Sequence, residues 1–272
     1  MSSIEQQVRI DLHSLLITCY LPVYLTLTHC QFWKKTSCTL RILLLGPTAV
    51  GKTSLSLSLA EQLNAEIISA DSRQCYKYTD IGTAKPTTEE LEQVRHYNIS
   101  LFEPDVKDSA AGFYERSMKW EDQIRAKGKN ILYVGGSTLH LQSIIKPLDD
   151  IPDANEQHIA ELEQHIKEEG IEPLYRQLQQ VDPEYAQKMD GMNPQRIVRA
   201  LDVWKQTGKP FSSFHSDDKS ITLPPETLVF GLKRERQKLY DRINERTDRM
   251  FEHGFLDEVK QILDMGYSRN DP

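Results

Sequence analysis

Short apolar runs alternate with amphipathic segments over the first half of the chain. RILLL (41–45), AEIISA (65–70) and NILYVGG (130–136) are continuous and apolar, which is typical of buried parallel strands. The segments between them that predict helices are TSLSLSLAEQL, TTEELEQVRHY (87–97) and AAGFYERSMKWEDQIRAKG, the last closed by Gly128. Strands that alternate with helices predict an α/β fold, a parallel sheet with helices on both faces.

Beyond about residue 154 the pattern changes to helices alone, as far as residue 208. DPEYAQKM and NPQRIVRALDVWKQTG each begin with a capping Asp or Asn followed by proline, and the second ends at Gly208. ETLVFGLK (226–233) then predicts a strand that returns to the sheet, before a long charged helix. The expected segments are an N-terminal extension (1–40), a core (41–150), a helical insertion (151–220) and a return to the core (221–272).

The N-terminal extension is apolar between residues 12 and 30, but this stretch contains His13, Pro22 and His29. It is short for a membrane-spanning helix, and it has neither a basic start nor a small-residue cleavage site. We expect a poorly ordered extension or an upstream start of translation, with a membrane or targeting role as the alternative.

Composition narrows the class of protein only slightly. A chain of 272 residues with 39% hydrophobic and 27% charged residues can form one sizeable core with an added subdomain. Its net charge of −7 argues against a surface covered by nucleic acid, although it allows a local basic groove. None of the four cysteines forms a Cys-x-x-Cys pair, which favours a reducing compartment, the cytoplasm, over disulfide or zinc frameworks.

GPTAVGKT (46–53) matches the phosphate-binding motif G-x-x-x-x-G-K-[ST] between a predicted strand and a predicted helix. Gly46 and Gly51 allow the backbone to wrap an anion, toward which N–H groups and the helix N-terminus point. Lys52 adds a positive charge, and Thr53 can offer its hydroxyl to Mg²⁺. The core is therefore expected to be a P-loop NTPase-like sheet.

Asp71 and Ser137 follow the second and third predicted strands, so we expect them at the same sheet edge as Lys52. Asp71 could bind Mg²⁺ through water, accept a proton from a nucleophile, or only cap the next segment. The third strand ends in glycines and Ser137 rather than in the acidic residue of hydrolytic NTPases, which favours a transferase. Two classes stay open on these residues: a small-molecule kinase with Asp71 as base, and an enzyme that transfers the carbon group of a diphosphate.

Four motifs in order resemble those of the tRNA dimethylallyltransferases, also called tRNA isopentenyltransferases: GPTAVGKT, ISADSRQCYKYTDIGTAKP, VGGSTLHLQSI and NPQRIVRALDVWKQTGKPFS. The resemblance implies transfer of a dimethylallyl group from its diphosphate to the exocyclic N6 amine of the adenosine 3′-adjacent to the tRNA anticodon. It implies dimethylallyl diphosphate and the anticodon stem-loop of tRNA as partners and Mg²⁺ as cofactor. We expect no membrane partner. We also expect the protein to be a monomer.

On this resemblance Asp71 accepts a proton from the amine, Lys52 and Mg²⁺ stabilise the leaving diphosphate, and Ser137 hydrogen-bonds near the reacting centre. The family more often has threonine where this chain has Ser137. The diphosphate-binding residues implied are Gly46, Pro47, Thr48, Ala49, Val50, Gly51, Lys52 and Thr53, with Thr53 as the Mg²⁺ ligand. The tRNA-binding residues implied are Asp71, Ser72, Arg73, Gln74, Gln195, Arg196, Ile197, Val198 and Arg199.

The C-terminal part departs from the family pattern. The chain stops at MGYSRNDP, where family members continue with a diphosphate-binding arginine and a basic stretch, so the resemblance implies a truncated chain. The alternative to an active enzyme is a catalytically impaired fragment that only binds tRNA. The basic residues before that point could follow the RNA backbone or form a solvated, salt-bridged helix; they are Lys233, Arg234, Arg236, Arg242, Arg246 and Arg249.

Overall fold

The protein is described by a computed structural model over residues 7–12, 15–20, 39–146, 149–215, 223–224 and 226–268, the first two ranges by their backbone alone. The chain divides into two compact units, Met1–Lys146 with Thr222–Pro272, and Pro147–Ile221. Of the predicted N-terminal extension, residues 1–6, 13–14 and 21–38 lie outside the described residues.

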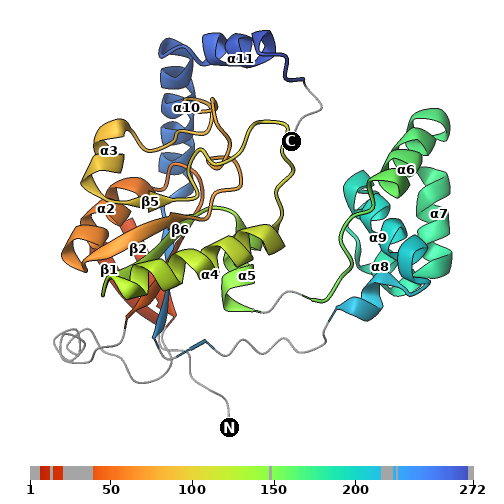
Figure 1. Ribbon diagram of the computed structural model, residues 1–272, viewed down its shortest axis with the longest axis horizontal. Coiled ribbons are helices and arrows are strands. Elements are labelled where there is room, and N and C mark those ends of the chain that lie inside the picture. Colours follow the sequence, from red (N-terminus) through yellow and green to blue (C-terminus); the bar gives the residue numbers. More distant parts are fainter. Residues whose placement is uncertain are drawn as a thin grey trace. The chain divides into compact units, whose positions relative to one another are not determined.

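The first unit contains a seven-stranded sheet with the strand order β1-β2-β7-β3-β6-β4-β5 (Figure 1). The strands are β1 (Gln7–Leu12), β2 (Leu15–Tyr20), β3 (Arg41–Leu45), β4 (Ala65–Ser69), β5 (His96–Tyr97), β6 (Asn130–Gly135) and β7 (Thr227–Lys233). β7, β3, β6, β4 and β5 are parallel, and the β1–β2 hairpin extends the sheet from β7 in antiparallel pairing. The parallel core confirms the predicted α/β class.

Helices cover both faces of the parallel strands. α2 (Lys52–Gln62) packs on one face, and α4 (Ala110–Ala126) and α5 (Thr138–Ile145) pack on the other. The unit also contains α3 (Thr88–Gln93), α10 (Arg236–Glu252) and α11 (Phe255–Asp264). Ile42 and Leu44 of β3 pack in one cluster with Leu57 of α2, whereas Leu43 packs in another with Phe113 of α4. Alternate residues of a strand point to opposite faces, so a strand covered on both sides needs the continuous apolar run found there.

One predicted helix differs from the structure. A helix was predicted over residues 87–97, but the observed helix α3 covers only Thr88–Gln93. His96–Tyr97 form the strand β5 beside β4. Val94 ends that helix in an extended conformation, and the buried Val94 and Tyr97 side chains suit the edge of a sheet better than a solvated helix. Within the predicted N-terminal extension, the backbone of Gln7–Leu12 and Leu15–Tyr20 forms the paired strands β1 and β2.

Helices are the regular elements of the second unit within its described residues. Its elements are α6 (Glu156–Glu169), α7 (Glu172–Val181), α8 (Pro183–Lys188), α9 (Pro194–Thr207) and the 3₁₀ helix η2 (Phe211–Phe214). The predicted caps are present: Asp182 accepts a hydrogen bond from the N–H of Tyr185 (3.0 Å), and Asn193 accepts one from that of Arg196 (3.1 Å). In neither unit does a described helix combine the length and apolar character needed to cross a bilayer.

A buried carboxylate ties β4 to its neighbours in the first unit. Glu66 accepts hydrogen bonds from the Tyr97 hydroxyl (2.7 Å) and from Nζ of Lys127 (2.9 Å) and Lys129 (2.9 Å). Burial alone would raise the pKa of Glu66, but these donors outweigh it and lower the pKa to about 2. The charged form of Glu66 is therefore the one that the fold stabilises.

Glu66 should make stability depend on pH. Its folded pKa is depressed, so its contribution is complete above the unfolded value of 4.5 and is lost as the pH falls toward about 2. Between about pH 5 and about pH 3, urea denaturation should show a larger loss of unfolding free energy for the wild type than for Glu66→Gln. Glu115→Gln, at an exposed position of α4, should behave like the wild type, and identical pH dependence in all three proteins would contradict this account.

Candidate active site

The phosphate loop (residues 46–53) leaves the first turn of α2 open to an anion. Gly51 occupies the N-cap position in the left-handed conformation (φ 113°), and no side chain caps the helix. The N–H groups of the first turn and the positive end of the helix dipole are thus available to phosphate oxygens. Lys52 lies over the same loop, where its Nζ donates to the carbonyl oxygens of Gly46 and Pro47, both at 2.8 Å.

Arginines from the C-terminal part of the chain surround this loop. Arg234, directly after β7, donates to the carbonyl of Val50 (3.2 Å), and Arg242 of α10 donates to that of Ala49 (2.8 Å). One turn farther along α10, Arg246 interacts electrostatically with both Lys52 and Asp71. The phosphate loop therefore lies beside residues that come from nearly two hundred positions later in the chain.

Lys52, Arg246 and Asp71 form one charge cluster. Burial lowers the pKa of Lys52, Asp71 opposes that shift, and Arg246 adds to it. Burial likewise lowers the pKa of Arg246, and Asp71 again opposes the shift. The sequence interpretation assigned Arg246 either to a surface that follows RNA or to a solvated, salt-bridged helix, and it missed the place of Arg246 beside the phosphate loop. Its i,i+4 spacing from Arg242 on one helix face was the available signal.

The ends of β3, β4 and β6 meet at this edge, as predicted. The N–H of Ser137 donates to the carbonyl of Ala70 (3.3 Å), the residue before Asp71. A Cβ atom on Gly135 would lie 2.2 Å from that carbonyl oxygen, so only glycine permits so close an approach of the two strand ends. A Cβ atom on Gly136 would lie 3.9 Å from Nζ of Lys52. The three loops that carry Lys52, Asp71 and Ser137 are therefore in contact.

Asp71 uses one carboxylate oxygen for the local turn. Its Oδ1 accepts hydrogen bonds from the N–H groups of Arg73 (2.8 Å) and Gln74 (3.3 Å). Its Oδ2 makes no hydrogen bond within the described residues. Asp71 also lines a small cavity of about 60 Å³ together with Lys52 and Thr53. Asp71 thus has the capping role that was considered for it, and its Oδ2 stays available to bind a ligand or accept a proton.

Other residues near Asp71 serve the fold. Gln74 accepts a hydrogen bond from the Ser69 hydroxyl (2.9 Å) and donates to the carbonyl of Ala84 (3.0 Å), so its amide braces the loop from both ends. The Ser137 hydroxyl accepts from the N–H of His140 (3.4 Å) and caps α5. Burial raises the pKa of Cys75 to about 11, so this thiol stays protonated near neutral pH and is no candidate nucleophile.

A second, larger cleft adjoins the phosphate loop. Its volume is about 410 Å³, and it begins at Gly46 and Pro47. Much of the remaining lining is aliphatic, with Leu45, Ile145 and Val229 among its residues. An anion-binding loop thus borders an apolar space, an arrangement that suits a ligand with a charged end and a hydrocarbon end.

The second unit carries the other residues predicted to bind tRNA. Gln195 and Arg196 are exposed at the start of α9, but Ile197 and Val198 are buried in the core of this unit. Their side chains pack against neighbouring helices, so the expectation of a surface made by residues 195–199 is corrected at these two positions. Apolar residues inside the QRIVR motif follow the helical period that buries one face.

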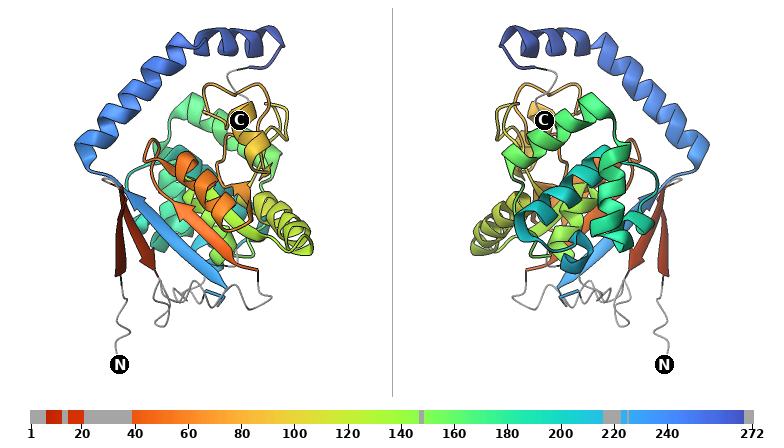
Figure 2. Two further views of the ribbon diagram at one scale, coloured as in Figure 1. Left: turned by 90° about the vertical axis from the view of Figure 1, so that its left-hand side faces the viewer. Right: turned by 90° about the vertical axis from the view of Figure 1, so that its right-hand side faces the viewer.

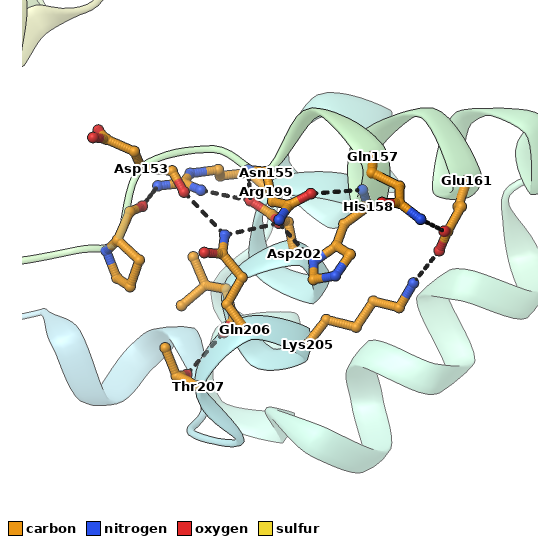
Figure 3. A network of polar contacts seen from close by, with 12 residues as sticks. Asp153, Asn155, Gln157, His158, Glu161, Arg199, Asp202, Lys205, Gln206 and Thr207 are labelled. Carbon is orange, nitrogen blue, oxygen red and sulfur yellow. Dashed lines mark hydrogen bonds and ion pairs between the residues drawn. The ribbon is translucent and has the colours of Figure 1, made fainter.

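Arg199 belongs to a polar network within the same unit (Figure 3). It donates to Oδ2 of the buried Asp202 (2.7 Å) and to the carbonyl of Pro152. Gln206 donates to Oδ1 of Asp202 (2.9 Å), and His158 lies 3.3 Å from the same oxygen. Arg199 therefore neutralises a buried carboxylate and fixes the segment before α6 on α9. Of the two arginines of α9 that were predicted to bind tRNA, Arg196 is exposed, whereas Arg199 is partly buried.

Comparison with known proteins assigns a family to this arrangement. A family model described as IPP transferase matches residues 74–272, which is most of the chain. This chain belongs to the IPP transferase family. A tRNA dimethylallyltransferase of Salinibacter ruber is 46% identical over 226 residues, covering 81% of this chain and 67% of the relative. One of Acetivibrio thermocellus is 40% identical over 230 residues, covering 84% and 74%.

Solved structures agree with that assignment. The full-length tRNA isopentenylpyrophosphate transferase of Bacillus halodurans is 36% identical, with a TM-score of 0.55, over 86% of this chain and 73% of the other. A eukaryotic dimethylallyltransferase described as acting on tRNA is 28% identical, with a TM-score of 0.70, over 86% of this chain and 58% of the other. The resemblance inferred from the motifs is confirmed at the level of the family.

Arg246→Met should weaken the binding of inorganic diphosphate by about tenfold or more, because hydrogen bonds to charged groups contribute about 1.5–3 kcal/mol. Isothermal titration calorimetry would measure the change in Kd. Arg249→Met is the matched control, since Arg249 lies less than one turn away, is exposed, and pairs with Glu245 (3.0 Å). Equal losses in both variants would show that only the overall charge of α10 matters and would contradict a place for Arg246 in the site.

Proposed function

We propose that this chain transfers a dimethylallyl group from dimethylallyl diphosphate to the exocyclic N6 amine of the adenosine 3′-adjacent to the anticodon of tRNA. The observation that carries the proposal is the meeting of an open phosphate loop and Asp71 at one sheet edge, in a member of the IPP transferase family. The names of the relatives, tRNA dimethylallyltransferases, support the same substrates.

The phosphate loop holds the leaving group. As the bond from the allylic carbon to the diphosphate oxygen breaks, negative charge grows on the diphosphate. The open N-terminus of α2 and the charges of Lys52 and Arg246 lie at the phosphate loop, so we assign to them the stabilisation of this negative charge. This role needs cations and N–H donors but no hydrolytic water, in agreement with a β6 strand that ends at Gly135 and is followed by Ser137 rather than by an acidic residue.

Asp71 acts on the nucleophile. The N6 amine of adenine is a weak nucleophile because its lone pair is delocalised into the ring. Oδ2 of Asp71 accepts the N6 proton while nitrogen forms its bond to the allylic carbon. The hydrogen bonds from Arg73 and Gln74 to Oδ1 fix the plane of the carboxylate and so aim Oδ2. The Ser137 hydroxyl accepts from the N–H of His140, and we assign its O–H donor to a hydrogen bond with the reacting groups.

The apolar cleft beside the phosphate loop suits the five-carbon chain. Its aliphatic lining matches a dimethylallyl group, and it borders the loop residues Gly46 and Pro47. A hydrocarbon bound there is shielded from water, which would otherwise compete with the amine for the allylic carbon.

Mg²⁺ fits the small cavity between the phosphate loop and Asp71. Thr53, which lines it, offers its hydroxyl as the metal ligand. The described residues include no group of three or more His, Cys, Asp or Glu side chains around a metal position, and Mg²⁺ commonly takes one or two protein oxygens plus substrate phosphates. When bound there, Mg²⁺ would neutralise charge on the diphosphate.

The adenosine must leave its stack to reach Asp71, since transfer to N6 requires access to that atom. Ser72 and Arg73 are exposed directly beside Asp71, and they are the proposed contacts to the extruded nucleotide. Gln195 and Arg196 of the second unit are proposed to contact tRNA elsewhere. A monomeric enzyme in the cytoplasm stays a prediction.

The test of this function is mass spectrometry of digested tRNA. The chain, given dimethylallyl diphosphate, Mg²⁺ and unmodified tRNA but no ATP, should add one five-carbon unit to an anticodon-loop adenosine. Lys52→Met should abolish the product, because it removes the central cation of the phosphate loop. A phosphorylated product formed only with ATP would establish the kinase alternative instead. Salt-sensitive tRNA binding without transfer would establish a chain that only binds tRNA.

A further inference from the structure

The C-terminal helices of the first unit contact both sides of the candidate site. α10 reaches the phosphate loop through Arg242, and α11 reaches the Asp71 loop (residues 71–86). Figure 2 shows that α11 turns away from α10 toward the loops that follow β4. The two helices therefore link the loop that binds the leaving group to the loop that carries Asp71.

Glu258 makes the contact between α11 and the Asp71 loop. Its Oε2 accepts a hydrogen bond from the N–H of Ile81 (2.7 Å), and its Oε1 accepts one from the N–H of Gly82 (2.9 Å). A Cβ atom on Gly82 would lie 2.7 Å from the Phe255 ring, so the loop backbone rests directly on the helix. Glu258 has no ion pair among the described residues, and both of its carboxylate oxygens accept from backbone N–H groups.

The same loop segment is linked to Asp71 through Gln74. The Gln74 amide donates to the carbonyls of Thr83 (3.3 Å) and Ala84 (3.0 Å), the residues directly after Gly82. The backbone N–H of Gln74 donates in turn to Oδ1 of Asp71 (3.3 Å). The path from Glu258 to Asp71 thus runs through one loop segment and one side chain.

The conformation of this segment needs outside support. Ala84 has a φ of 45°, a left-handed conformation that costs a non-glycine residue about 1–2 kcal/mol. A residue keeps such a strained backbone conformation only where contacts with the surrounding structure hold it in place. Glu258 and Gln74 hold the segment from its two sides, and they are contacts that can supply this support.

We propose that Glu258 is a positioning residue of the transfer reaction. It holds residues 81–84 and, through Gln74, keeps the Asp71 carboxylate in the orientation that receives the N6 proton. The effect of Glu258 on proton transfer rests on the proposed function. Its effect on the conformation of the Asp71 loop does not. Glu258 itself touches neither the phosphate loop nor a reacting atom.

Amide-resolved hydrogen exchange tests the structural link without any substrate. In Glu258→Ala, the amides of Ile81 and Gly82 should exchange at least about tenfold faster, as expected when a charged hydrogen bond is lost. The amides of Arg73 and Gln74, which Asp71 binds, should accelerate as well. Asp257→Ala is the matched control: it removes an exposed carboxylate from the same helical turn, one that makes no hydrogen bond to this loop within the described residues, and exchange at these amides should stay unchanged.

Kinetics test the consequence. Glu258→Ala should lower the single-turnover transfer rate by about tenfold or more while the Kd for dimethylallyl diphosphate stays within about twofold of the wild type. Glu258→Gln, which keeps one carbonyl acceptor, should recover part of the rate. Asp257→Ala should transfer at the wild-type rate.

Three results would overturn the proposal: faster exchange at residues 81–82 without any change at 73–74, unchanged exchange at all four amides, or unchanged transfer by Glu258→Ala. A wild-type chain that transfers nothing would instead count against the proposed function alone. The exchange data would then still decide whether Glu258 fixes Asp71.

Discussion

Parallel pairing of β3, β6 and β4 is the constraint on which the site depends. Parallel strands direct their carboxyl ends to the same edge of the sheet, so the loops that follow them gather there. Gly135 allows the ends of β6 and β4 to approach to a distance that a side chain would prevent. Lys52, Asp71 and Ser137 come from three separate segments, yet the sheet brings their loops into contact.

The electrostatics follow from that geometry. Three side-chain cations, Arg234, Arg242 and Lys52, donate to backbone carbonyls of the phosphate loop, next to the positive end of α2. Burial penalises the charge on Lys52, and Asp71 offsets only part of that cost. Such a site suits a multiply charged anion, and the proposed diphosphate leaving group would gain most from it because its charge increases during the reaction.

Local patterns predicted much of this arrangement. Continuous apolar runs identified β3, β4 and β6, and the phosphate motif with the strand ends identified Lys52, Asp71 and Ser137, because these features depend on neighbouring residues. The site roles of Arg246 and Glu258 were not found, because their contacts join distant parts of the chain and a charged helix face looks solvated from sequence. Glu258 binds residues 176 and 177 positions away, and Arg246 of α10 interacts with Asp71. Ile197, Val198 and Arg199 carry a family motif, but packing and a buried Asp202 decide where their side chains lie.

The role of Asp71 is the central claim, because one carboxylate oxygen holds the turn and the other is assigned to the N6 proton. The most direct measurement compares Asp71→Asn with the wild type in single-turnover transfer at saturating tRNA, together with the Kd for tRNA. An asparagine keeps an oxygen that can accept from Arg73 and Gln74, but it cannot take a proton. The account predicts a transfer rate lower by about 100-fold or more, with the tRNA Kd changed by less than about threefold. A parallel loss of rate and tRNA affinity would contradict it and make Asp71 a binding or folding residue.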